Sequence, residues 1–347
     1  MGRVKDEYFF SLIRDYPTIY LPVQRKASLN TVVAYRIVLD QLLKFISDRE
    51  KTKYASVTFD MVSKESINAY LDFLTEKRHL SPATRNNRLA AIKSFLSYAA
   101  AMRPEYISLM DSIASIKMQK DDPFSKVDYL SESAVKALLN APDISTQIGL
   151  RDQFFMIMLY DTGGRIQEIL DIRVCDIKLG TTPNIILYGK GKMTRVVPLM
   201  TSTVSHLLKY MKAFHANETW NSQKWLFYSV HYSVAEKICD DTFRVRLNHY
   251  AKKAQEKCPE VPDTIHPHLW RHTRAMHLYQ HGMDLTLISQ WLGHKQLTTT
   301  LVYAHADTEA KRLAIEKAIG KNSPAEYAAM PKASDKEETI KKLYGLT

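Results

Sequence analysis

Residues 265–281 are IHPHLWRHTRAMHLYQH, the most histidine- and arginine-rich stretch of this sequence. His268, Arg271 and His272 are spaced by three and four residues, so in a helix their side chains share one face. Histidines at this spacing can bind zinc, but the stretch has no Glu in an HExxH arrangement and no Cys or Asp at ligand spacing. The stretch therefore predicts a polar helix face without a metal site.

Three other motifs accompany this stretch. Residues 162–170 are TGGRIQEIL, and residues 291–305 are WLGHKQLTTTLVYAH, in which a histidine follows Leu-Gly and a tyrosine comes later. Residues 185–199, IILYGKGKMTRVVPL, place two β-rich runs around a Gly-Lys-Gly-Lys turn, which predicts a hairpin. The candidate chemistry is therefore confined to the C-terminal part of the chain.

Helical patterns dominate the N-terminal part. Apolar residues recur at three- and four-residue spacing over residues 31–45, which predicts an amphipathic helix. A second helix is expected over residues 63–77. A third opens at Ser81 and Pro82, an N-cap followed by proline at the first helical position, and a fourth begins near Pro104.

The C-terminal part is also predicted to be helical. Ser131 begins one helix, and residues 151–160 form a buried helix that ends at the glycine pair 163–164. Gly293 suits a helix C-terminus and Thr298 suits an N-cap, so positions 294 and 303 are expected on successive helices. The fold class is therefore mainly α, with a small antiparallel β-sheet in the C-terminal domain.

The length of 347 residues indicates about two domains, each with its own core. Residues 118–128 lose apolar periodicity and gather charge, which favours a linker. We expect a helical domain over residues 1–120, a linker over 121–128, a second domain over 129–322 and a tail over 323–347.

The overall charge favours a polyanionic partner. Lys and Arg number 48 against 37 Asp and Glu, which gives a net charge of +11. This charge favours nucleic acid as the partner, with an anionic membrane as the second candidate. The longest apolar run, residues 154–160, is far shorter than the ~20 residues of a membrane-spanning helix. Cys175, Cys239 and Cys258 show no CxxC spacing, so neither a disulfide framework nor a zinc ribbon is expected. A cytoplasmic protein without a membrane partner fits this composition.

The four motifs resemble those of the tyrosine recombinase or phage integrase family, including Xer-type resolvases and the integrase-like transposases of mobile elements. In that family they are approximately TG-x-R-x-x-E-L, G-K-G-x-x-x-R-x-x-P-L, H-x-L-R-H-T and L-G-H-x-x-x-x-T-T-x-x-Y, and all four occur here in that order. Gly164, Trp270 and Arg274 depart from the common pattern, but none is a catalytic position. The resemblance implies a helical core-binding domain followed by an α-rich catalytic domain.

The resemblance also implies a catalytic set, which is Arg165, Lys190, His268, Arg271, His294 and Tyr303. Guanidinium groups bind phosphate oxygens in a bidentate way and stay charged, which suits the two arginines to a pentavalent phosphate. A tyrosine hydroxyl has a pKa of about 10, so Tyr303 would need His268 as a base or oxyanion partner. His294 would donate a further hydrogen bond, and Lys190 at the hairpin tip would protonate the leaving 5′-oxygen.

Other side chains are candidates for support or for DNA contact. Glu168 lies three residues after Arg165 and either orients that arginine or is a solvated helix charge. His272 is a candidate either for orienting a catalytic side chain, as Glu168 is, or for a purely structural role. The candidates for DNA contact, each equally compatible with a solvated face, are Arg85, Asn86, Arg88, Lys93, Lys192 and Arg195.

The resemblance implies a site-specific DNA recombinase of the integrase or transposase type, which cuts and rejoins strands through a 3′-phosphotyrosyl intermediate without metal, ATP or another cofactor. Its partners would be double-stranded recombination sites, bound by a homotetramer on two paired sites, with accessory DNA-bending or directionality factors. The tail, which carries Ile340, Leu343 and Tyr344, would dock on a neighbouring protomer or remain a loose charged end. The alternatives are a type IB topoisomerase-like strand relaxer and a non-catalytic DNA-binding accessory protein.

Overall fold

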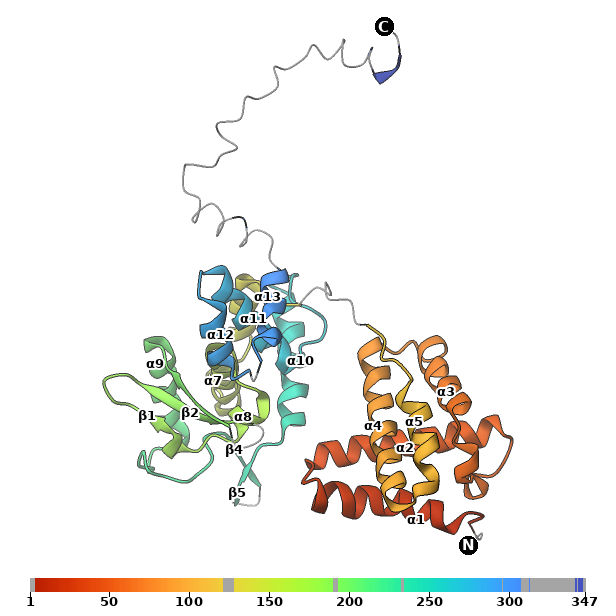
Figure 1. The fold of residues 1–347 in the computed structure, drawn as a ribbon. Helices are drawn as coiled ribbons and strands as arrows, with labels where there is room; N and C mark the ends of the chain where they lie inside the picture. The colour runs from red at the N-terminus through yellow and green to blue at the C-terminus, as the bar shows by residue number, and fades with distance from the viewer. Residues whose placement is uncertain are drawn as a thin grey trace. The chain divides into compact units, whose positions relative to one another are not determined.

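Contacts between Cα atoms divide the chain into two compact units, Met1–Pro123 and Phe124–Thr347. Each unit has a hydrophobic core of its own. No helix in the described part of the chain is both long enough and apolar enough to span a membrane. The computed structural model (Figure 1) describes residues 4–120, 128–189, 193–231, 234–294 and 296–306, together with a few positions beyond residue 311.

The N-terminal unit is built from helices. Its α-helices are α1 (Glu7–Asp15), α2 (Leu29–Arg49), α3 (Lys64–Glu76), α4 (Pro82–Met102) and α5 (Ile107–Ala114). Its π-helix and 3-10 turns are η1 (Tyr16–Gln24), η2 (Tyr54–Ser56), η3 (Phe59–Met61) and η4 (Pro104–Tyr106). The side chains of Ser28, Ser63 and Ser81 accept hydrogen bonds from backbone amides in the first turns of α2, α3 and α4. Ser81 caps α4 as the sequence predicts, whereas α2 begins at Leu29, before the expected start at residue 31.

Two elements at the N-terminus, α1 and η1, go beyond the sequence prediction. Pro17 and Pro22 lie within η1, so its residues do not follow the 3.6-residue apolar period of an α-helix. The buried Tyr16 nevertheless holds this segment to the core, because its hydroxyl donates a hydrogen bond to Ser94 Oγ on α4 at 2.7 Å.

The C-terminal unit is also mainly helical. Its elements outside the sheets are α6 (Glu132–Leu139), α7 (Gln147–Thr162), α8 (Ile166–Leu170), η5 (Val174–Asp176), α9 (Thr201–Phe214), α10 (Asp240–Gln255), α11 (Pro267–Gln280), α12 (Leu285–Leu292) and α13 (Thr298–Ala306). Phe154, Phe155 and Leu159 of α7 are at most 1% exposed. Burial of several sides of α7 is what its nearly continuous apolar sequence predicts.

A small antiparallel sheet lies within this helical unit. Its strands are β1 (Ile177–Lys178), β2 (Asn184–Tyr188) and β3 (Thr194–Pro198), in the order β1-β2-β3. Strands β2 and β3 form the predicted hairpin, with Ile186 opposite Val196. The turn residues Lys190 and Lys192 lie outside the described residues.

A second hairpin, β4 (Tyr228–His231) with β5 (Val234–Lys237), was not expected. Most of β5 is exposed, so its residues lack the apolar alternation that marks a half-buried strand.

The turn after α7 brings two distant helices together. Gly163 has a φ of +58°, and a Cβ there would lie 2.8 Å from Leu292 Cδ2 on α12. Glycine is the residue that tolerates both this left-handed backbone and this close approach. The next residues therefore begin α8 beside the end of α12.

Candidate active site

Arg165 directly precedes α8 and keeps 39% of its side chain exposed. Its Nη1 donates a hydrogen bond to Glu168 Oε1 at 2.7 Å, and its backbone N–H donates to Glu168 Oε2 at 2.9 Å. The Glu168 side chain is only 4% exposed, which rules out a solvated helix charge. Glu168 therefore orients Arg165 through both carboxylate oxygens.

Arg195 on β3 binds the same carboxylate. Its Nη2 donates to Glu168 Oε2 at 2.7 Å, and its side chain is 12% exposed. Burial raises the pKa of Glu168, but the hydrogen bonds and charges of Arg195 and Arg165 outweigh it and hold the pKa below its ordinary value. The sequence placed Arg195 among the candidate DNA contacts, whereas the structure turns its guanidinium inward because a buried carboxylate needs a second cation.

Arg271 lies on α11 and is 4% exposed. Its Nη1 donates to the Gly163 carbonyl at 2.8 Å, and its Nη2 donates to the Leu292 carbonyl at 2.6 Å. Burial, with the charge of Arg165, lowers the pKa of Arg271 to about 10. The side chain stays cationic at neutral pH and ties the end of α7 to the end of α12.

Tyr303 on α13 is buried, and its hydroxyl lies 3.0 Å from His272 Nδ1. Burial raises the pKa of Tyr303, and the charge of Arg271 opposes that rise. His268, one turn earlier on α11, has its pKa lowered by partial desolvation and by Arg271. The hydroxyl of Tyr303 therefore contacts His272, a candidate for support, and not His268, the residue expected as its base.

His294 follows Gly293, whose φ of +66° gives α12 the left-handed cap expected there. Its Nδ1 lies 2.8 Å from Thr300 Oγ1 on α13. Burial, with the charges of Arg271 and Arg165, lowers the pKa of His294 to about 4, so this imidazole is neutral at pH 7.

Five residues of the expected catalytic set thus lie in one unit, close enough that the charge of Arg271 lowers or opposes a rise in the pKa of the two histidines and the tyrosine, and the charge of Arg165 lowers that of Arg271. They come from the start of α8, from α11, from the end of α12 and from α13, and they are Arg165, His268, Arg271, His294 and Tyr303. The sixth, Lys190, lies outside the described residues.

Sequence reasoning missed the inward orientation of Arg195, because Val196 and Val197 are both apolar and the sequence does not show which face of the strand is buried. Side chains two residues apart on a strand point to the same face, and Val197 is 1% exposed. The alternation along β3 therefore places Arg195 on the buried face of the hairpin.

Of the four candidate DNA contacts on α4, one is buried and two bind backbone groups of the N-terminal unit. Arg85 is 7% exposed, and Asn86 exchanges two hydrogen bonds with the Gln119 backbone, at 2.8 and 2.9 Å. Lys93 Nζ donates to the Ala114 carbonyl in the last turn of α5 at 3.0 Å, and to the Ile116 carbonyl just beyond that helix at 2.8 Å. Long side chains satisfy such helix-end carbonyls readily, so Lys93 supports the end of α5. Arg88 is the fourth candidate DNA contact on α4, and it forms no ion pair with an acidic side chain among the described residues.

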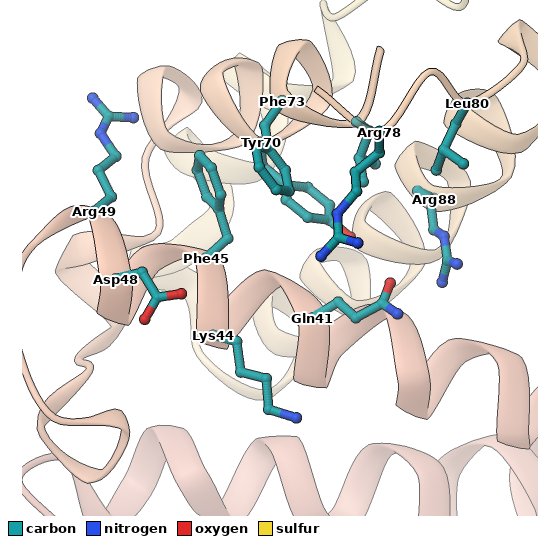
Figure 2. Close-up of a pocket in the computed structure, with 11 residues that line it drawn as sticks. Gln41, Lys44, Phe45, Asp48, Arg49, Tyr70, Phe73, Arg78, Leu80 and Arg88 are labelled. Atoms are coloured by element: carbon teal, nitrogen blue, oxygen red, sulfur yellow. The ribbon is translucent and has the colours of Figure 1, made fainter. Parts of the chain in front are cut away.

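Arg88 borders a pocket of about 800 Å³ lined by residues of α2, α3, α4 and the turn between α3 and α4 (Figure 2). Phe45, Tyr70 and Phe73 supply aromatic rings, and the Arg78 guanidinium lies 5.6 Å from the centre of the Phe73 ring. Tyr70 is 1% exposed, and its hydroxyl has no hydrogen-bond partner within the described ranges. The N-terminal unit thus presents cationic side chains beside aromatic rings.

Comparisons with known proteins match both units. Residues 128–310 match the model of the phage integrase family, and residues 18–103 match the N-terminal SAM-like domain of phage integrases. The chain is 33% identical, over 87% of each protein, to an integrase/recombinase of Sinorhizobium fredii. It is 29% identical to the tyrosine recombinase XerD of Oceanobacillus iheyensis, over 82% of this chain and 91% of that one.

The fold is also found among solved structures. The integrase of the transposon Tn1549, in complex with a circular intermediate DNA, superposes with a TM-score of 0.64 over 88% of this chain and 99% of that chain, at 18% identity. The family matches together cover both units of the chain. The chain therefore belongs to the phage integrase family, the family of the tyrosine recombinases.

Proposed function

We propose that this protein cuts and rejoins DNA strands at specific sites through a 3′-phosphotyrosyl intermediate, with Tyr303 as the nucleophile. The observation that carries the proposal is the convergence of Arg165, Arg271, His294 and Tyr303 from separate elements. The charges of Arg165 and Arg271 lower the pKa of His294, and the charge of Arg271 opposes the rise in the pKa of Tyr303. Perturbed ionisable groups of this kind gather at sites of catalysis.

The charge of the site suits a phosphodiester. Arg165 and Arg195 bind one carboxylate, Glu168, and Arg271 lies near enough for that carboxylate to influence its pKa, so the group keeps a net positive charge. Fixed guanidinium groups stabilise the extra negative charge of a pentavalent phosphate, which is the role that metal ions fill in other phosphoryl-transfer enzymes. We therefore propose a reaction without a metal or nucleotide cofactor.

The buried hydroxyl of the nucleophile must become exposed before it can attack a phosphate. Tyr303 is 1% exposed, so its hydroxyl cannot reach a phosphate in this arrangement. Movement of α13 upon DNA binding would expose the phenol, and His268 or His272 would take its proton. His294, neutral at pH 7, would donate a hydrogen bond to the phosphate through a ring N–H.

Lys190 is proposed as the general acid that protonates the leaving 5′-oxygen. Lys190→Ala should therefore slow cleavage of normal DNA far more than cleavage of DNA with a 5′-bridging sulfur, because a thiolate leaves without a proton. Single-turnover cleavage of the two substrates measures this difference. An equal loss on both would exclude Lys190 and make Lys192 the next candidate.

The proposed partners are double-stranded recombination sites, held as two paired sites by a homotetramer with accessory factors. The net charge of +11 supports binding to DNA, and Arg88 and Lys192 remain proposed DNA contacts. Most of the proposed linker over 121–128 and most of the tail over 323–347, the proposed docking segment, lie outside the described residues. A DNA-acting protein with this composition is proposed to work in the cytoplasm.

A nicked suicide substrate made from DNA flanking the gene tests the proposed function. We expect a protein–DNA adduct that survives denaturant and forms equally well with excess chelator, because arginines supply the positive charge. Absence of an adduct on every flanking sequence, or a strict magnesium requirement, would contradict the proposal. Relaxation of supercoiled DNA without recombination would instead favour a topoisomerase.

A further inference from the structure

We propose that Arg195 is a positioning residue for DNA cleavage, which shares the charge of Glu168 so that Arg165 remains available to the phosphate. This inference rests on the proposed function. It concerns a side chain that makes no contact with the reacting atoms and acts through another residue.

The carboxylate of Glu168 lies between two guanidinium groups. Its Oε1 accepts from Arg165 Nη1 at 2.7 Å, and its Oε2 accepts from Arg195 Nη2 at 2.7 Å. Without Arg195, the buried negative charge would have Arg165 as its nearest cation, and a bidentate pair would form between them. That pair would neutralise Arg165 and draw its donors away from a bound phosphate.

Arg195 also packs against the turn that leads to His294. A Cβ on Gly293 would lie 3.1 Å from Arg195 Cδ and 3.5 Å from its Nη1. The same side chain thus touches β3, the start of α8 and the end of α12. It links the base of the hairpin that carries Lys190 to two other parts of the site.

Compared with Arg165, which binds the same carboxylate, Arg195 is poorly placed for the simpler role of a phosphate contact. The Arg195 side chain is 12% exposed, whereas Arg165 is 39% exposed and bound to the same carboxylate. The Nε of Arg195 is buried and has no hydrogen-bond partner in the described part of the molecule. A phosphate could reach this guanidinium only after its pair with Glu168 had opened, while Arg165 already faces solvent.

The test uses the full-length protein and the suicide substrate at saturating concentration. Arg195→Gln should slow single-turnover cleavage by roughly 10- to 100-fold, as loss of a supporting partner does in other sites, with the DNA Kd changed by less than about twofold. Arg195→Lys keeps the charge but loses the planar, paired donors of the guanidinium. Its cleavage rate should lie between the rates of the wild type and Arg195→Gln. Thr194→Ala, at the exposed neighbouring position of β3, should cleave like wild type.

A double-substitution cycle separates positioning from a merely structural role. If Arg195 acts through Arg165, Arg195→Gln should have little further effect on cleavage in an Arg165→Ala background. Equal slowing in both backgrounds would overturn the proposal in favour of general stabilisation. So would unchanged cleavage at saturation combined with weaker binding and a salt slope reduced by about one, the signature of a phosphate contact. Failure of the wild-type protein to form an adduct would contradict the proposed function instead.

Discussion

Tyr303→Phe should abolish formation of the covalent protein–DNA adduct while DNA affinity stays nearly the same. The substitution removes one hydroxyl, whose partner is His272 Nδ1, and keeps the buried ring. DNA affinity depends on many phosphate contacts, to which this hydroxyl adds little. Loss of one hydrogen bond should lower the free energy of unfolding by only about 1 kcal/mol. Suicide-substrate cleavage, gel-shift titration and thermal unfolding measure the three quantities.

A second tyrosine–histidine pair provides a matched control. The Tyr160 hydroxyl lies 2.8 Å from His277 Nδ1, also on α11, outside the proposed site. Tyr160→Phe should keep adduct formation at the wild-type level. An adduct formed by the Tyr303→Phe protein would show that another side chain is the nucleophile.

Arg165→Ala and Arg271→Ala should each slow cleavage by at least about 100-fold, the usual effect of losing one fixed donor to a developing oxyanion. Their effects on stability should differ. Arg271→Ala leaves the carbonyls of Gly163 and Leu292 without this donor, at a cost of about 1–3 kcal/mol for each buried group left unpaired. Arg165 is 39% exposed, so its loss should change the free energy of unfolding less. Single-turnover cleavage and urea unfolding of both variants check this contrast.

Arg271→Lys distinguishes charge from geometry at the same position. Lysine keeps the positive charge but cannot direct two fixed N–H groups at Gly163 and Leu292 as the guanidinium does. We expect slow cleavage by this variant as well. An effect of less than about tenfold for Arg165→Ala would place that residue outside the reaction.

The helix starts and stops were predictable because their causes lie within a few residues. Ser81 and Pro82 begin α4, and Gly163 and Gly293 end α7 and α12 in the left-handed conformation that glycine favours. The start of α13 was placed less well, because Thr298 is the first helical residue and not the cap. The N-terminal η1 was not predictable from apolar periodicity, because prolines and π-helical hydrogen bonding change the period.

The roles of the α4 side chains could not be separated from the sequence. Lys93 and Arg88 lie on one helix and have the same charge, yet Lys93 binds the end of α5 while Arg88 borders a pocket. A basic residue on a helix face is equally compatible with solvent, DNA or a helix end. The choice depends on which chain segment packs beside it.

Local sequence determined the mainly helical fold, its caps, the hairpin and the identity of the side chains gathered at the site. The tertiary structure alone decided which of those side chains meet. Glu168 pairs with Arg195 across 27 positions, Tyr303 with His272 across 31, and Arg271 with Gly163 across 108. Caps and periodicity act over about one helical turn, whereas these pairs form only when helices and strands pack and a buried charge or hydroxyl must find its partner.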